Sequence, residues 1–75
     1  MKIDNEACYT LTVHNAQHHV KSVQGYASIN TLNELLSKYM KDNYIVRLHS
    51  NNDLALVYWC VGKGGEQDLV TLAKN

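Results

Sequence analysis

The sequence predicts an α+β domain, in which an antiparallel β-sheet carries one amphipathic helix on one face (ββαββ, with a fifth C-terminal strand favoured). Residues 31–41 repeat their apolar side chains with the period of a helix, and residues 7–14 alternate as a half-buried strand does. The run 54–61, LALVYWCV, is apolar at every position. As a strand it is apolar on both faces, and one helix covers only one of them. The other face must meet the rest of the chain, a second copy or a different protein.

Size and composition predict a single folded domain over residues 1–75. An apolar fraction of 45% with 19% charged residues is typical of a globular chain. Seven basic and seven acidic residues cancel, which disfavours generic nucleic-acid binding. No apolar run approaches the ~20 residues of a membrane span, and no export leader opens the chain, so we expect a cytoplasmic protein without a membrane partner. Cys8 and Cys60 are then reduced, although a disulfide between them stays open if their strands are neighbours.

The first third of the chain predicts a β-hairpin. Residues 7–14 place apolar and polar side chains on opposite faces, and the polar residues 15–17 suit a turn. Residues 18–26 follow, where Val20, Val23 and Tyr26 lie three apart and break strict alternation. A bulge, an irregular segment and a short helix all remain open there, and Gly25 is a natural place for a bulge.

The helix is predicted over residues 31–41. Its apolar stripe consists of Leu32, Leu35, Leu36, Tyr39 and Met40. Thr31 and Glu34 fit a capping box at its start, and residues 42–43 end it.

The last part of the chain predicts a second hairpin and an ambiguous tail. Strands over residues 44–49 and 54–61 flank the turn residues 50–53, and the glycine-rich residues 62–65 then break the chain. In the tail, residues 66–75, early acidic residues and a late Lys74 suit a helix, whereas Val70, Thr71 and Leu72 suit an edge strand. A strand is favoured.

Candidate chemistry is sparse, and we predict no enzyme activity, no metal and no other cofactor. His14, His18 and His19 gather at the first turn, but two cross-strand imidazoles do not complete a metal site, so exposed turn histidines are favoured. At an interface they would make binding sensitive to pH. Lys63 lies among glycines but lacks the spacing of a phosphate loop. Cys60 lies in an apolar run, where burial keeps a thiol inert, and the acidic residues are scattered.

The aromatic residues favour a protein interface. In the second hairpin Trp59 points away from Tyr58, to the face that also carries Val57. We predict that Trp59, Val57, Arg47 and His49 form a protein-binding surface, with Arg47 and His49 adding polar contacts beside an apolar centre. Three alternatives remain: Trp59 and Val57 pack in the core, they form a homodimer through their sheets, or the sheet binds single-stranded nucleic acid weakly. The last lacks a basic groove.

The order of elements resembles that of small phage-encoded inhibitors, including some anti-CRISPR proteins. The resemblance rests on residues 7–14, 31–41, 44–49 and 54–61, and contains no diagnostic motif. It implies a protein that blocks a host protein or complex in the host cytoplasm by occupying its surface. Many anti-CRISPR proteins are acidic and imitate DNA, and the zero net charge of this chain does not fit that mechanism.

Overall fold

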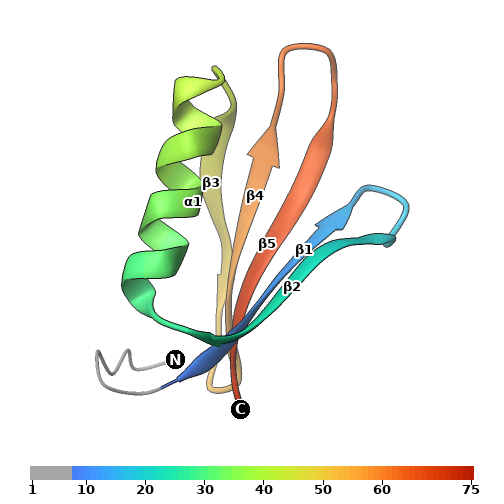
Figure 1. Ribbon diagram of the computed structural model, residues 1–75. Coiled ribbons are helices and arrows are strands. Elements are labelled where there is room, and N and C mark those ends of the chain that lie inside the picture. The colour runs from blue at the N-terminus through green and yellow to red at the C-terminus, as the bar shows by residue number, and fades with distance from the viewer. Residues whose placement is uncertain (1–7) are drawn as a thin grey trace.

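The computed structural model describes residues 8–75, which form a five-stranded antiparallel sheet and one helix (Figure 1). The elements in chain order are β1 (Tyr9–Asn15), β2 (Val20–Ala27), α1 (Ile29–Lys41), β3 (Ile45–Asn51), β4 (Ala55–Val61) and β5 (Gln67–Lys74). The predicted α+β class with an antiparallel sheet is confirmed. Residue 7, the first of the predicted strand 7–14, lies outside the described residues. The helix in the described part of the chain is too short and too polar to cross a membrane.

The C-terminal tail forms the central strand of the sheet. The strand order is β2-β1-β5-β4-β3, so β5 pairs antiparallel with β1 on one side and with β4 on the other. The helical alternative for the tail is wrong, and so is the edge position. Each hairpin has an edge of unpaired backbone groups, and β5 satisfies both edges at once.

The β1–β2 pair contains two bulges, which settles the irregular spacing of the second strand. One extra residue of β2 lies between Gln24 and Ala27, and a second is Lys21. Tyr26, in the first bulge, has a left-handed backbone conformation (φ 57°). Both bulges keep β2 paired with β1 although its apolar residues do not alternate.

The helix begins at Ile29, two residues before the predicted start. Ser28 is the N-cap: its Oγ accepts from the Thr31 amide (3.3 Å), and Thr31 Oγ1 accepts from the Ser28 amide (3.2 Å). The capping box predicted at Thr31 and Glu34 is therefore wrong, because Thr31 serves as the third helical residue of an earlier box. At the other end Asn43 takes a left-handed conformation (φ 66°), and its amide donates to the Met40 carbonyl.

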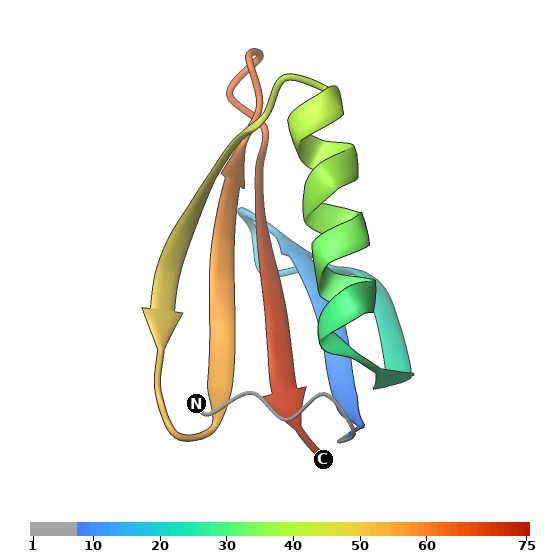
Figure 2. The same cartoon turned by 90° about the vertical axis from the view of Figure 1, so that its left-hand side faces the viewer.

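The hydrophobic core lies between the helix and one face of the sheet (Figure 2). Its buried residues are Tyr9, Leu11, Val13, Ala27, Leu32, Leu36, Leu56, Cys60, Val70 and Leu72. Of the predicted helical stripe, Leu35 and Tyr39 are partly buried against this core, but Met40 is exposed. We call the side of the sheet that faces this core the closed face.

Candidate protein-binding face

The opposite side of the sheet, which we call the open face, has no described element lying over it (Figures 1 and 2). Leu56 and Cys60 of β4 are buried on the closed face, so Val57 and Trp59, which alternate with them along the strand, point the other way. The same alternation and the strand register define the whole open face. Its residues are Thr10, Thr12, His14, Val20, Val23, Ile45, Arg47, His49, Ser50, Ala55, Val57, Trp59, Val61, Gln67, Leu69, Thr71 and Ala73.

The structure brings the four predicted interface residues together on the open face. Arg47 is the register partner of Trp59 across β3 and β4, and Val57 lies two residues before Trp59 on the same face. His49 is the extra residue of a bulge in β3, and its imidazole meets the indole edge to face, with ring centroids 6.5 Å apart. Trp59 is 39% exposed and neither it nor Val57 belongs to the core. The alternative in which they fill the core is therefore wrong.

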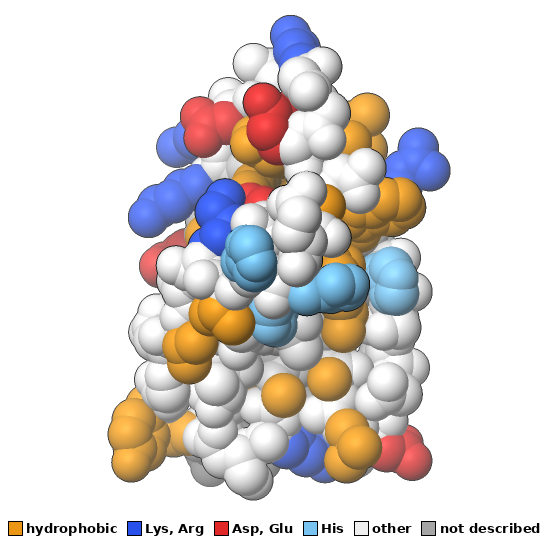
Figure 3. Space-filling view, turned by 90° about the vertical axis from the view of Figure 1, so that its right-hand side faces the viewer, with side chains coloured by type: hydrophobic (Ala, Val, Ile, Leu, Met, Phe, Trp, Pro, Cys, Tyr) orange, Lys and Arg blue, Asp and Glu red, His pale blue; other side chains and the backbone are white. Residues whose placement is uncertain are grey.

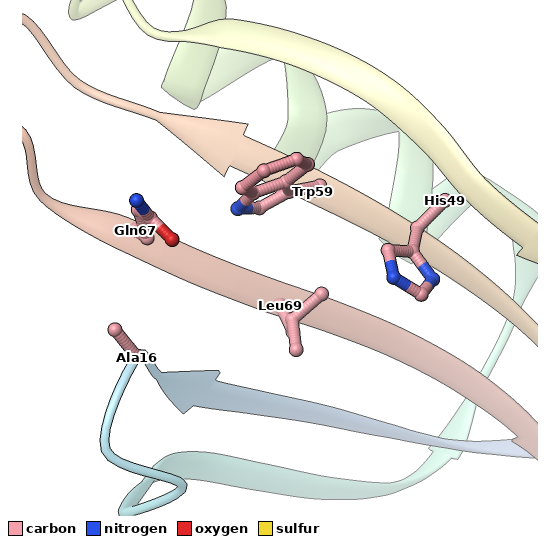
Figure 4. A pocket seen from close by; sticks show the side chains of 5 residues that line it. All are labelled: Ala16, His49, Trp59, Gln67 and Leu69. Atoms are coloured by element: carbon pink, nitrogen blue, oxygen red, sulfur yellow. The ribbon is translucent and has the colours of Figure 1, made fainter.

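Trp59 borders an open hollow of ≈ 200 Å³ (Figure 4). Its lining residues are Ala16, His49, Trp59, Gln67 and Leu69. Figure 4 shows the indole between the side chains of Gln67 and His49, with Leu69 on the adjacent strand. The hollow thus joins an aromatic ring and an aliphatic side chain to two polar groups that can donate or accept hydrogen bonds.

Sequence reasoning missed three of these lining residues, namely Ala16, Gln67 and Leu69. Leu69 is the register partner of Trp59, because β5 folds back onto β4 through the turn at residues 62–66. The apolar residue in the ambiguous tail was a signal, but it indicated a location only once the tail was known to be a strand paired with β4.

The histidine side chains gather in the middle of the open face (Figure 3). His14 is the register partner of Leu69, so His14, Leu69, Trp59 and Arg47 form one row across four strands. The described residues contain no group of three or more His, Cys, Asp or Glu side chains that could hold a metal ion.

The closed side contains a buried polar network of a different kind. The Asp68 carboxylate is 3% exposed, and its Oδ2 accepts from Tyr39 Oη (2.7 Å) and from Lys21 Nζ (2.8 Å). Lys21, which reaches Asp68 from β2, is the extra residue of a bulge in that strand. This ion pair joins the edge hairpin to the central strand, and the Lys21 side chain is half exposed.

The pKa values of three groups in or beside this network are raised, so these groups keep their protons more firmly than usual. Burial, and then the hydrogen bond to Asp68, raise the pKa of Tyr39. Burial, and then the Asp68 charge, raise the pKa of the Cys60 thiol to about 11. The hydrogen bond to Asp68 raises the pKa of Lys21 as well. A buried thiol with a raised pKa is a poor nucleophile, so this cluster is suited to holding the fold together.

The two cysteines do not pair. Cys8 is exposed and Cys60 is buried, and both are free thiols. No family model, curated protein or solved structure matches the chain.

Proposed function

We propose that this chain is a non-enzymatic protein-binding domain, which docks onto a partner protein through its open face and inhibits that partner by covering its surface. One observation carries the proposal. Trp59 lies near the centre of an open face on which no described element packs, and β5 lies beside it in the sheet. An apolar face flanked by polar groups is the usual composition of an interaction surface.

The open face has the size of a small interface. Five strands spaced by about 4.8 Å, with about seven residues of 3.3 Å each, cover about 24 by 23 Å, or about 550 Å². A partner of equal size would bring the buried total to about 1,100 Å², which belongs with the smaller specific interfaces. Binding then depends on the anchor, and Trp is the side chain that most often supplies one.

Occlusion is the mode of action that fits an open sheet face whose hollow beside Trp59 is small and open. In this proposal the partner is a host protein or complex, and the chain inhibits it stoichiometrically. The resemblance to small phage-encoded inhibitors supports the same mode of action.

The proposal is tested by comparing two variants in quantitative capture of host proteins. Trp59→Ala removes the anchor, whereas Met40→Ala removes an exposed apolar side chain from the helix, 55% exposed. We expect a partner that binds the unaltered chain and Met40→Ala but binds Trp59→Ala at least about tenfold more weakly. Circular dichroism and urea unfolding check that both variants fold. A partner that binds all three chains equally contradicts the proposal.

The alternative occupant of the open face is a second copy of the chain. Sedimentation equilibrium over a range of concentrations distinguishes the two. A monomer is expected, and a dimer that Trp59→Ala dissociates would replace the proposal with a homodimeric domain.

A further inference from the structure

We infer that the open face recognises a patch of carboxylates on its partner protein, and that this recognition strengthens as its histidines gain protons. The inference rests on the proposed function and names the chemistry of the partner. It is carried by the distribution of charge between the two sides of the sheet.

The strands of the open face carry cationic and titratable groups but no carboxylate. Arg47, His14 and His49 lie on the face, and His18 and His19 are exposed in the turn that follows β1. The described carboxylates lie elsewhere: Glu34 in the helix, Asp42 at its end, Asp53 and Glu66 in turns, and Asp68 on the closed face. Within residues 8–75 of a chain of zero net charge, the only ionisable side chains at the strand positions of the open face are thus ones that are positive or can become so.

These groups flank the apolar centre from both sides. In the row His14, Leu69, Trp59 and Arg47, the two ends are three strand spacings apart, or about 14 Å. A partner whose apolar side chain enters beside Trp59 can therefore place carboxylates toward Arg47 on one side and toward His14 on the other. Arg47 offers a fork of donors that matches a carboxylate.

The charge pattern argues against the other two occupants. A symmetric dimer through the open face would bring two copies of the same cationic face together, and like charges across an interface cost binding energy. Nucleic acid needs several basic side chains along its backbone and aromatic side chains for successive bases. The open face has one guanidinium and one aromatic ring, with no lysine. A protein surface bearing Asp or Glu fits best.

The pH dependence follows from the groups around the histidines. His49 meets Trp59 and shares its strand with Arg47, and His14 is opposite Leu69 and Val20. Glu66 and Asp68 flank Gln67 of the hollow along the chain; Glu66 Oε2 accepts from the Gly64 amide, and Asp68 is buried on the closed face. Lys21 is already bound to Asp68. Histidine changes charge between about pH 5 and 8, so acidification adds positive charge where no strand carboxylate neutralises it.

The test uses a random peptide library selected on the immobilised full-length chain at about pH 5.8. Peptides that bind through the open face are those that bind Met40→Ala but not Trp59→Ala. We expect these peptides to be enriched in Asp and Glu beside an apolar residue. Their affinity is expected to fall about tenfold at about pH 7.5, the change that one or two charge-assisted hydrogen bonds supply.

Matched variants assign the effect to named residues. The double variant His14→Gln and His49→Gln should abolish most of the pH dependence. Arg47→Gln should weaken binding at both pH values, and Lys38→Gln, which removes a cation from the helix, should change neither. Replacing Asp and Glu of a selected peptide by Asn and Gln should remove both effects.

Different failures have different meanings. Peptides that depend on Trp59 but show no acidic enrichment, or bind equally at both pH values, overturn this inference and leave the proposed function standing. A library in which no peptide depends on Trp59 overturns the proposed function. Trp59-dependent binding of a single-stranded oligonucleotide that falls steeply with salt overturns both in favour of nucleic acid.

Discussion

The closed and open faces of the sheet consist of side chains from the same strands, but only the closed face is covered by α1. In β4 every residue is apolar, yet Cys60 is 0% exposed whereas the adjacent Trp59 is 39% exposed. The two side chains differ in what lies over them, because α1 packs on one face and no described element packs on the other. Apolar composition alone therefore does not distinguish a core residue from a surface anchor.

The two faces also differ in whether their charged side chains are paired with an opposite charge. On the closed face the buried Asp68 is paired with a lysine and a tyrosine, so its charge contributes to the fold. On the open face Arg47 and the histidines have no carboxylate beside them on the strands. Paired charge inside stabilises one structure, and unpaired charge outside remains available to a partner.

The largest expected effect is the loss of stability when a closed-face side chain of β5 is truncated. Leu72 is completely buried in the core, whereas Leu69, three residues earlier on β5, is partly exposed on the open face. Leu72→Ala should lower the free energy of unfolding by about 3 to 5 kcal/mol, and Leu69→Ala by less than about 1.5 kcal/mol. Urea unfolding of both variants measures the difference. Equal losses would mean that the open face is covered as well.

The second effect is a loss of stability at high pH that originates on the closed face. A thiol in the unfolded chain ionises near pH 9, whereas Cys60 in the folded chain ionises near pH 11. Between these values the unfolded chain releases a proton that the folded chain keeps, so the free energy of unfolding falls as pH rises. The contribution is complete below pH 9, and its loss amounts to about 3 kcal/mol. Tyr39, whose pKa is also raised, acts in the same direction at higher pH.

Two cysteine variants check this alkaline loss. Urea unfolding from about pH 8 to 11 should show a shallower loss for Cys60→Ala than for the unaltered chain. Cys8→Ala, at an exposed thiol, should follow the unaltered chain. Identical curves for all three would remove Cys60 as the cause.

The third effect tests the buried ion pair. Asp68→Asn removes the charge that Tyr39 Oη and Lys21 Nζ donate to, and should cost about 2 kcal/mol. Lys21→Met should cost less, because its side chain is half exposed and the pair is screened by water. Thermal or urea unfolding compares them. A greater loss for Lys21→Met would show that the hairpin depends on this lysine for more than charge.

The smallest effect concerns the helix that closes the core. Ser28→Ala removes the N-cap oxygen and should lower the free energy of unfolding by about 1 kcal/mol. Glu34→Gln, at the position that the sequence suggested for the cap, should change it by less than about 0.3 kcal/mol. A larger loss of stability for Glu34→Gln would instead support the capping box that the sequence predicted at Thr31 and Glu34.

Local patterns were enough to place most elements but not all of their ends. The alternation of residues 7–14 and the stripe of residues 31–41 reflect side-chain directions that the backbone sets within a few residues. The cap was misplaced because Ser28 and Thr31 form the same kind of box as Thr31 and Glu34, and sequence alone does not rank the two.

The residues of the candidate site were likewise predicted only in part. Trp59, Val57, Arg47 and His49 were predicted to share a face, because two strands joined by a short turn pair with each other. Leu69 and Gln67 were not, because residues 66–75 were ambiguous between helix and strand, so their pairing with β4 across the turn at residues 62–66 was not predicted.

The sequence by itself determined the amphipathic helix, the first alternating strand and a strand with two apolar faces, since each depends on residues close together in the chain. Only the tertiary structure decided that the tail enters the middle of the sheet. That choice depends on the unpaired edges of two separate hairpins, and on Asp68 reaching Lys21 and Tyr39 across 47 and 29 residues. Because the tail joins the hairpins within the sheet, it does not cover Trp59, and no element of residues 8–75 lies over the open face.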